Sequence, residues 1–298
     1  TRGLQLQMTA QREAGGIVMN YATFRRQWML APFLEACAAA GMTRVSIWGD
    51  AVASLGEAQT QAMLRDLGLR IFGYNRAGPL LAAEAADRAA CLDTARAEVR
   101  RAAELGADHI LAFTGGLPPG ERGLADGRAR AADAIAEVLD EARVCGVTLA
   151  LEPLHPLRAG DRTVLCTLDE ANTLCAALGD GVGIVVDTHH VWWDARLEEQ
   201  LARATSRLVA FHVNDWLVPL PDPLAGRGMM GDGIIDLAGL WSMMRAHGYR
   251  GPIEVEIFSD KWWAEPPDAV LNIALERCKN IFGVSPGTDQ SRGPPQGP

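Results

Sequence analysis

The 298-residue sequence predicts an α/β fold, a single-domain (β/α)8 TIM barrel, from three observations. First, an Ala-rich amphipathic helix, a glycine and a short β-branched run recur along the chain, as in Ala38–Gly41 ahead of Arg44–Trp48. Second, eight such units can be counted, and their strand segments are nearly continuously apolar, as strands covered on both faces are. Third, the length suits one barrel, and no shift in composition marks a second domain.

Glycine marks each joint between a helix and the strand that follows, because glycine readily adopts the left-handed conformation that closes a helix. When a helix connects two consecutive strands of one sheet, the two strands run parallel. A doubly wound open sheet is the alternative, but no GxGxxG follows the first strand. The expected strands are 17–21, 43–48, 69–74, 108–113, 147–152, 182–187, 207–213 and 252–257, and the expected helices are 29–40, 56–67, 84–105, 124–145, 167–178, 195–205, 236–247 and 266–280.

The barrel is expected to span residues 1–285. Residues 286–298 are polar and rich in Pro and Gly, a composition that cannot bury enough apolar surface to fold, so we expect a disordered tail. No apolar run reaches the roughly 18 residues that span a bilayer, and the N-terminus lacks a basic region followed by an apolar stretch. We therefore expect a cytoplasmic protein that does not enter the membrane.

Composition also limits the partners. The net charge of −9 and the pI near 5.2 argue against nucleic-acid binding, which needs clustered Lys and Arg. A small polar metabolite is the expected partner. The six cysteines show no CxxC spacing and are expected to be buried free thiols.

Four strand segments in the second half of the chain each end on a residue that binds metal ions: Glu152, Asp187, His212 and Glu256. Such groups are costly to bury alone, and a shared cation accounts for all four at once. In a (β/α)8 barrel the carboxyl ends of the strands open on one face, which carries the active site. The sequence therefore predicts a metal centre there. Glu254 competes with Glu256 for the last position, but Glu256 lies nearer the strand end.

Three oxygen ligands and one imidazole indicate one divalent metal, with Mn²⁺ favoured, then Mg²⁺ or Co²⁺, and with Zn²⁺ left open. Further polar residues follow the ligands at short spacing. His190 lies three residues after Asp187, and Asp215 lies three residues after His212, where we expect it to orient the imidazole.

Candidate substrate-binding residues surround this set. Arg227 lies in a Gly-rich loop, and His155 follows Glu152 by three residues. Trp48 and Trp216 lie at strand ends, where an aromatic face can stack on the C–H face of a sugar. These positions favour a carbohydrate-like substrate.

Five segments together resemble the xylose isomerase-like TIM-barrel superfamily of sugar phosphate isomerases and epimerases, and the likeness covers essentially the whole barrel. They are Leu151-Glu-Pro-Leu-His-Pro156, Val186-Asp-Thr-His-His190, Phe211-His-Val-Asn-Asp215, Gly231-Asp-Gly233 and Glu254-Val-Glu-Ile-Phe-Ser259.

The resemblance to ketose 3-epimerases in this superfamily implies roles for single residues. Glu152 and Glu256 would bind the metal and also move protons, while Asp187 and His212 would complete the metal shell. By the same resemblance, His190 and Arg227 would contact substrate oxygens. The implied activity is a divalent-metal-dependent sugar or sugar phosphate isomerase or epimerase, which transfers a proton next to a carbonyl through an enediolate.

Several alternatives remain. The apolar segment 216–230 and the paired tryptophans could build a less polar pocket, so a metal-dependent lyase or dehydratase acting on a keto-sugar, keto-glycoside or inosose is the nearest alternative. An endonuclease IV-like repair enzyme is a remote alternative. Such an enzyme needs many histidine ligands for a trinuclear zinc cluster and a basic surface for DNA, whereas this sequence has six histidines and an acidic pI. A non-catalytic sugar-binding barrel is a further alternative. Loops rich in Met and Trp could also pack against a second copy in a homo-oligomer.

Overall fold

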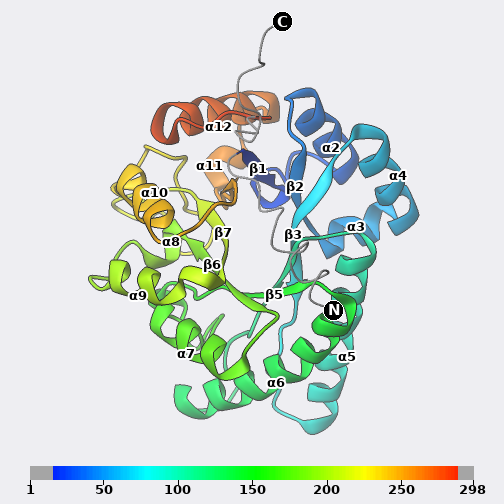
Figure 1. The fold of residues 1–298 in the computed structure, drawn as a ribbon, viewed down its shortest axis with the longest axis vertical. Helices are drawn as coiled ribbons and strands as arrows, with labels where there is room; N and C mark the ends of the chain where they lie inside the picture. Colours follow the sequence, from blue (N-terminus) through cyan, green and yellow to red (C-terminus); the bar gives the residue numbers. More distant parts are fainter. Residues whose placement is uncertain (1–15, 288–298) are drawn as a thin grey trace, which may run out of the picture.

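Eight parallel strands form a closed barrel in a computed structural model that describes residues 16–287 (Figure 1). The strands follow one another around the barrel in chain order, and pairing of Ile17 with Ile253 joins the last strand to the first. The predicted single-domain (β/α)8 TIM barrel is confirmed. The strands are β1 (Ile17–Asn20), β2 (Arg44–Trp48), β3 (Arg70–Ala77), β4 (His109–Ala112), β5 (Thr148–Leu151), β6 (Val182–Asp187), β7 (Leu208–Val213) and β8 (Ile253–Val255).

The longer helices surround the barrel and cover its outer face (Figure 1). They correspond to the eight expected helices, and Gly68 and Gly146 close two of them with φ angles of 68° and 73°, in the left-handed region that the helix-to-strand joints predict. These helices are α2 (Leu30–Ala39), α4 (Glu57–Leu67), α5 (Ala85–Glu104), α6 (Leu124–Cys145), α7 (Leu168–Leu178), α9 (Leu197–Ala204), α10 (Leu237–Ala246) and α12 (Pro267–Phe282).

Three short helices follow strand ends at the carboxyl face and were not expected from the sequence. They are α3 (Gly49–Leu55), α8 (Thr188–Val191) and α11 (Asp260–Trp263). Segments of four to seven residues are too short to show a helical period. Strand β3 also runs beyond the expected end at residue 74, because its pairing with β4 shifts register between Tyr74 and Ala77. Three single-turn 3₁₀ helices, Tyr21–Thr23, Pro156–Arg158 and Thr205–Arg207, complete the regular structure of residues 16–287.

The barrel interior contains a small buried apolar cluster that includes Val18, Ala150, Val185 and Ala210. Side chains alternate between the two faces of a strand, so the residue two positions further along points inward as well. Those residues are polar in all four strands. The apolar interior therefore changes to a polar layer at the carboxyl ends of the strands.

The predicted tail at 286–298 lies outside the described residues from position 288 onward, and its disorder stays a prediction. No helix within residues 16–287 combines the length and the apolar character needed to cross a membrane.

Candidate metal centre

The four predicted ligands meet at the carboxyl end of the barrel. Each offers one ligand atom, from Glu152, Asp187, His212 and Glu256, and these atoms all lie within 4.8 Å of one another. Strand register contributes directly, since Asp187 pairs with His212 on neighbouring strands. Glu152 and Glu256 each follow the last residue of their strand. The structure thus brings together the whole set that the strand ends predicted.

His212 lies at the centre of this group and is fully buried. Its Nδ1 atom lies 3.2 Å from Oε1 of Glu152 and 3.7 Å from Oε2 of Glu256. Neither Nδ1 nor the Glu152 Oε1 atom has a hydrogen-bond partner of good geometry, although both are buried. Buried polar atoms are rarely left unsatisfied. A cation shared by these atoms would satisfy both, so the residues present fit a metal ion.

The other ring nitrogen of His212 faces a different carboxylate. Nε2 lies 3.2 Å from Oε2 of Glu254, the residue that competed with Glu256 in the sequence. A metal-ligating histidine usually directs its second ring nitrogen to a carboxylate, which fixes the ring and its tautomer. Glu254 therefore holds the position of the orienting residue, one layer deeper in the barrel than Glu256.

Asp215 does not have the role expected for it. Instead of orienting His212, its carboxylate accepts backbone N–H groups of Trp216, Gly231, Gly233 and Ile235 at 2.8–3.1 Å. The expectation rested on sequence spacing alone, whereas these partners lie up to 20 residues away. Asp215 thus organises the loop between β7 and α10.

Asn20 was missed by the sequence reasoning. Its Nδ2 atom donates to Oε1 of Glu254 at 2.7 Å and to Oε1 of Glu256 at 3.1 Å, while its Oδ1 atom accepts from Nε1 of Trp48. One signal was available, because Asn20 is a polar residue at the end of the apolar strand β1. The amide holds both carboxylates of β8 in place.

Arg227 reaches the centre from the loop that Asp215 organises. Its Nη1 atom donates to Oδ2 of Asp187 at 2.8 Å and to Oε2 of Glu256 at 3.1 Å. The other carboxylate oxygen of Asp187 accepts the backbone N–H of His189 and the amide of Asn214. Asp187 therefore caps α8 while it faces the centre.

The electrostatics also suit a cation. Burial raises the pKa of Glu152 to about 7, an effect that His212 partly offsets. Burial alone would lower the pKa of His212, but the carboxylates of Glu254, Glu152 and Glu256 outweigh it and raise that pKa well above its usual value. With Asp187, four carboxylates face two cationic groups, His212 and Arg227. The centre carries excess negative charge that a divalent ion would neutralise.

His190 is held neutral beside this group, since burial and the nearby charge of Arg227 lower its pKa well below the usual value. Its Nδ1 atom accepts the backbone N–H of His155 at 3.1 Å, and this hydrogen bond places the proton on Nε2. Nε2 lies 3.3 Å from Nη2 of Arg227. Both atoms carry protons in this tautomer, so they do not hydrogen-bond to each other, and each can donate to an oxygen acceptor placed between them.

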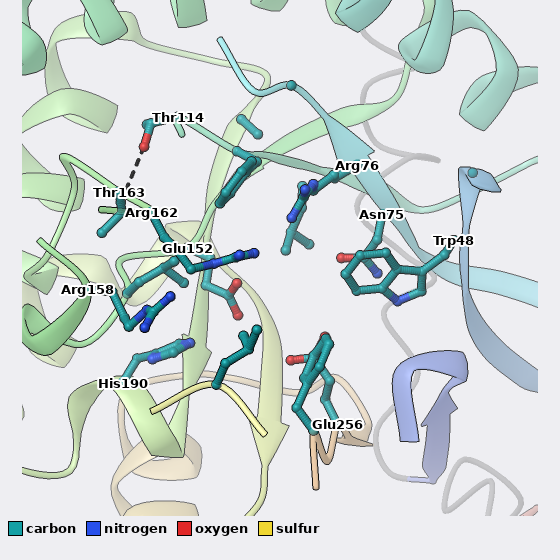
Figure 2. A pocket seen from close by; sticks show the side chains of 18 of the residues that line it. Trp48, Asn75, Arg76, Thr114, Glu152, Arg158, Arg162, Thr163, His190 and Glu256 are labelled. Carbon is teal, nitrogen blue, oxygen red and sulfur yellow. Dashed lines mark hydrogen bonds between the residues drawn. The ribbon is translucent and has the colours of Figure 1, made fainter. Parts of the chain in front are cut away.

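A cavity of about 470 Å³ opens above the centre. Figure 2 shows Glu152, Glu256, His190 and Trp48 directed toward its middle, and Arg227 also lies in its wall. The remaining two residues expected to bind substrate lie beside the wall. His155 and Trp216 stack on each other with ring centroids 4.6 Å apart, and Trp216 also packs on Trp192. Neither lines the cavity: the His155 backbone N–H donates to His190, and Trp216 packs against His189, so a substrate-contacting role for these two side chains is not supported.

Comparison with protein families finds a match over residues 34–281 to the family described as xylose isomerase-like TIM barrel. Comparison with curated proteins finds no match. A solved structure of a protein from Sinorhizobium meliloti 1021 is 42% identical, with a TM-score of 0.88, and the alignment covers 91% of this chain and 99% of that one.

Two more distant structures share the fold. The first is an IolI protein with a bound zinc atom, at 18% identity and a TM-score of 0.78, covering 90% of this chain and 98% of that one. The second is a D-psicose 3-epimerase with D-tagatose from Clostridium cellulolyticum H10, at 16% identity and a TM-score of 0.69, covering 90% of this chain and 99% of that one.

Proposed function

The chain belongs to the xylose isomerase-like TIM-barrel family, and we propose that it is a divalent-metal-dependent isomerase or epimerase of a sugar or sugar derivative. One observation carries the proposal: two carboxylates from different strands, Glu152 and Glu256, face the same imidazole nitrogen and the same cavity. A pair of carboxylates around one bound carbonyl compound can remove a proton and return it.

Glu152, Asp187, His212 and Glu256 would hold the ion. Bound there, a divalent ion polarises a substrate carbonyl and acidifies the neighbouring C–H group. The donor set of three carboxylates and one imidazole supports Mn²⁺ as the preferred ion, while the zinc in the IolI structure keeps Zn²⁺ among the ions to test.

The protein side chains then supply the proton transfers. Glu152 has a pKa raised to about 7 by burial, so near neutral pH it can accept a proton and release one. Glu256 follows β8, whereas Glu152 follows β5, and it is held by Asn20 and Arg227. It would act on the other face of the substrate. His190 would donate its Nε2–H to a substrate oxygen and stabilise the enediolate together with Arg227.

The proposal is tested with a panel of D-fructose, D-tagatose and an inosose in D₂O, with added Mn²⁺ or with EDTA. We expect deuterium to enter at the carbon next to the carbonyl, in an EDTA-sensitive reaction that NMR can follow. Glu152→Gln and Glu256→Gln should each lower turnover by roughly a hundredfold or more. Asp50→Asn is the matched control, because Asp50 lies in the cavity wall but pairs with Arg25.

Full activity in both glutamine variants would show that these carboxylates are not the bases. Loss of water from the inosose with no isomerised product would identify the lyase alternative instead.

A further inference from the structure

Five arginines line the cavity, and three of them have a carboxylate partner. Arg25 pairs with Asp50, Arg158 pairs with Asp161, and Arg227 pairs with Asp187 and Glu256. Arg76 and Arg162 differ, since neither guanidinium has a carboxylate or a hydrogen-bond acceptor partner among residues 16–287. Asp50 and Glu152 act on Arg76, and Asp161 acts on Arg162, only through their more distant charge, whereas the groups in direct contact with the two guanidinium groups are aromatic rings.

These two guanidinium groups lie close to one aromatic ring. Cζ of Arg76 lies 3.8 Å from the centroid of Phe113, and Cζ of Arg162 lies 5.7 Å from the same centroid. Figure 2 shows both side chains pointing into the cavity, with Arg162 beside Glu152 and Arg76 next to Asn75. Stacking on a ring orients a guanidinium but leaves its N–H donors free to bind a ligand.

Neighbouring loops hold the two arginines in this position. Arg76 lies at the carboxyl end of β3, whereas Arg162 belongs to the loop after β5. The hydroxyl groups of Thr114 and Thr163 lie 3.2 Å apart and join that loop to the one after β4 (Figure 2). Segments at the carboxyl ends of β3, β4 and β5 therefore place the two arginines side by side.

Two guanidinium groups placed near each other without a hydrogen-bonded carboxylate are costly to the fold. Burial and the nearby charge of Arg162 lower the pKa of Arg76 to about 10, and burial and Arg158 lower the pKa of Arg162. Two positive charges close together in a partly buried wall favour the binding of a negatively charged ligand. Planar guanidinium groups are suited to phosphate and carboxylate oxygens, which they bind through two parallel hydrogen bonds.

We infer that Arg76 and Arg162 form an anion subsite, and that the substrate carries an oxyanion group, a phosphate or a carboxylate, away from its reacting carbonyl. The inference rests on the proposed function for the carbonyl end of the substrate. It narrows the substrate class from sugars in general to acidic sugar derivatives.

The test uses binding rather than turnover, so that its failure is separate from failure of the proposed function. The probes are D-fructose, D-fructose 6-phosphate and D-fructuronate, which share one skeleton and differ in the terminal group, together with inorganic phosphate. Affinity is measured by calorimetry on the Mn²⁺-loaded full chain. We expect one anionic ketose to bind roughly tenfold or more tightly than D-fructose, and the stronger of the two identifies the group as phosphate or carboxylate.

Variants assign this preference to the two residues. Arg76→Gln and Arg162→Gln should each abolish it while leaving D-fructose affinity unchanged, and Arg76→Lys should retain part of it because the charge remains. Arg25→Gln is the matched control, since Arg25 lies over the ring of Trp48, as Arg76 does, but is paired with Asp50.

Two results would overturn the inference: equal affinity for all three ketoses with no phosphate binding, or an anion preference that both glutamine variants retain. An anion preference in a protein that exchanges no deuterium would support the subsite and count against the proposed reaction.

Discussion

At the scale of single residues, the centre depends on how His212 uses its two ring nitrogens. Nδ1 faces Glu152 and Glu256, and Nε2 faces Glu254. The first side can bind an ion only when the nitrogen has lost its proton, and the proton that remains would then sit on Nε2, which faces Glu254. Binding of a metal and loss of a proton are therefore linked at this residue.

This linkage predicts the pH dependence of metal affinity. The raised pKa values of Glu152, about 7, and of His212 mean that both groups hold protons at acidic pH, and a metal ion must displace them. Apparent Mn²⁺ affinity should therefore rise as pH increases through about 7, with about one to two protons released per ion. Calorimetry in buffers of different ionisation enthalpy measures the release. Glu152→Gln should release fewer protons, and a pH-independent affinity would contradict the prediction.

The contrast between Glu254 and Asp215 gives a second prediction. Glu254→Gln should weaken Mn²⁺ binding by roughly 10–100-fold, because the His212 ring loses its charged partner. Asp215→Asn should have a smaller effect on Mn²⁺ affinity and should instead lower the free energy of unfolding by about 1–3 kcal/mol, since backbone N–H groups lose their acceptor. Metal titration and chemical denaturation of both variants separate the two roles. The reverse pattern would restore Asp215 as the orienting residue.

Much of the site follows from residues near in sequence. An apolar run that ends on a ligand-type residue is a local pattern, and barrel closure brings all such ends to one face, so Glu152, Asp187, His212 and Glu256 could be predicted together. The partners of Asp215 and the bridge from Asn20 to β8 could not be predicted, because they join residues 16–20 and 234–236 positions apart. Nothing in the local pattern encodes those contacts.

At the scale of elements, the loop between β7 and α10 positions Arg227. Within this loop the backbones of Asp215 and Gly228 form an antiparallel β-bridge. Arg227 donates its backbone N–H to the carbonyl oxygen of Phe258. Gly233 allows the close approach, because a Cβ atom there would lie 2.2 Å from the Trp216 carbonyl oxygen and 2.6 Å from Oδ1 of Asp215. The fold of this loop leaves no room for a side chain at that position.

Gly233→Ala should therefore destabilise the protein by about 1–3 kcal/mol and also lower kcat, since the loop must move and carry Arg227 with it. Gly248→Ala is the matched control. Gly248 has a φ of 91° at the joint before β8, at the other end of the barrel, so this variant should lose stability but keep kcat. Thermal denaturation and steady-state kinetics measure both effects. Equal effects of the two substitutions on kcat would argue against a positioning role for the loop.

Sequence reasoning was less complete for elements than for ligands. Glycine-closed helices and apolar runs located the eight strands and eight outer helices, because each is a local signal. Helix α8 was missed because its four residues depend on a cap, the hydrogen bond from the His189 N–H to Asp187, rather than on periodicity. The extension of β3 to Ala77 depends on a register shift with β4. That extension carries Arg76 to the cavity.

At the scale of the whole molecule, the barrel gathers negative charge at one end of an apolar interior. A bound divalent ion would compensate that charge only in the folded state, so it should stabilise the fold. At free Mn²⁺ about 100-fold above its Kd, we expect the Tm to rise by roughly 5–10 °C. Differential scanning calorimetry with Mn²⁺ and with EDTA measures the change, and the Asp187→Asn variant should show little of it. An equal rise in that variant would place the ion elsewhere.

The oligomeric state is a prediction that belongs to the same scale. Leu157, Trp193 and Val218 are exposed in the segments that follow β5, β6 and β7. The contact was expected through loops rich in Met and Trp; Trp193 is exposed, whereas Met229 and Met230 are buried, and the homo-oligomer stays a prediction.

An anomalous difference map from Mn²⁺-soaked crystals tests the central claim most directly. We expect a single strong peak within about 2.0–2.6 Å of one oxygen from each of Glu152, Asp187 and Glu256 and of the His212 Nδ1 atom. A map with no peak among these four side chains, or with its strongest peak on other residues, would contradict the account.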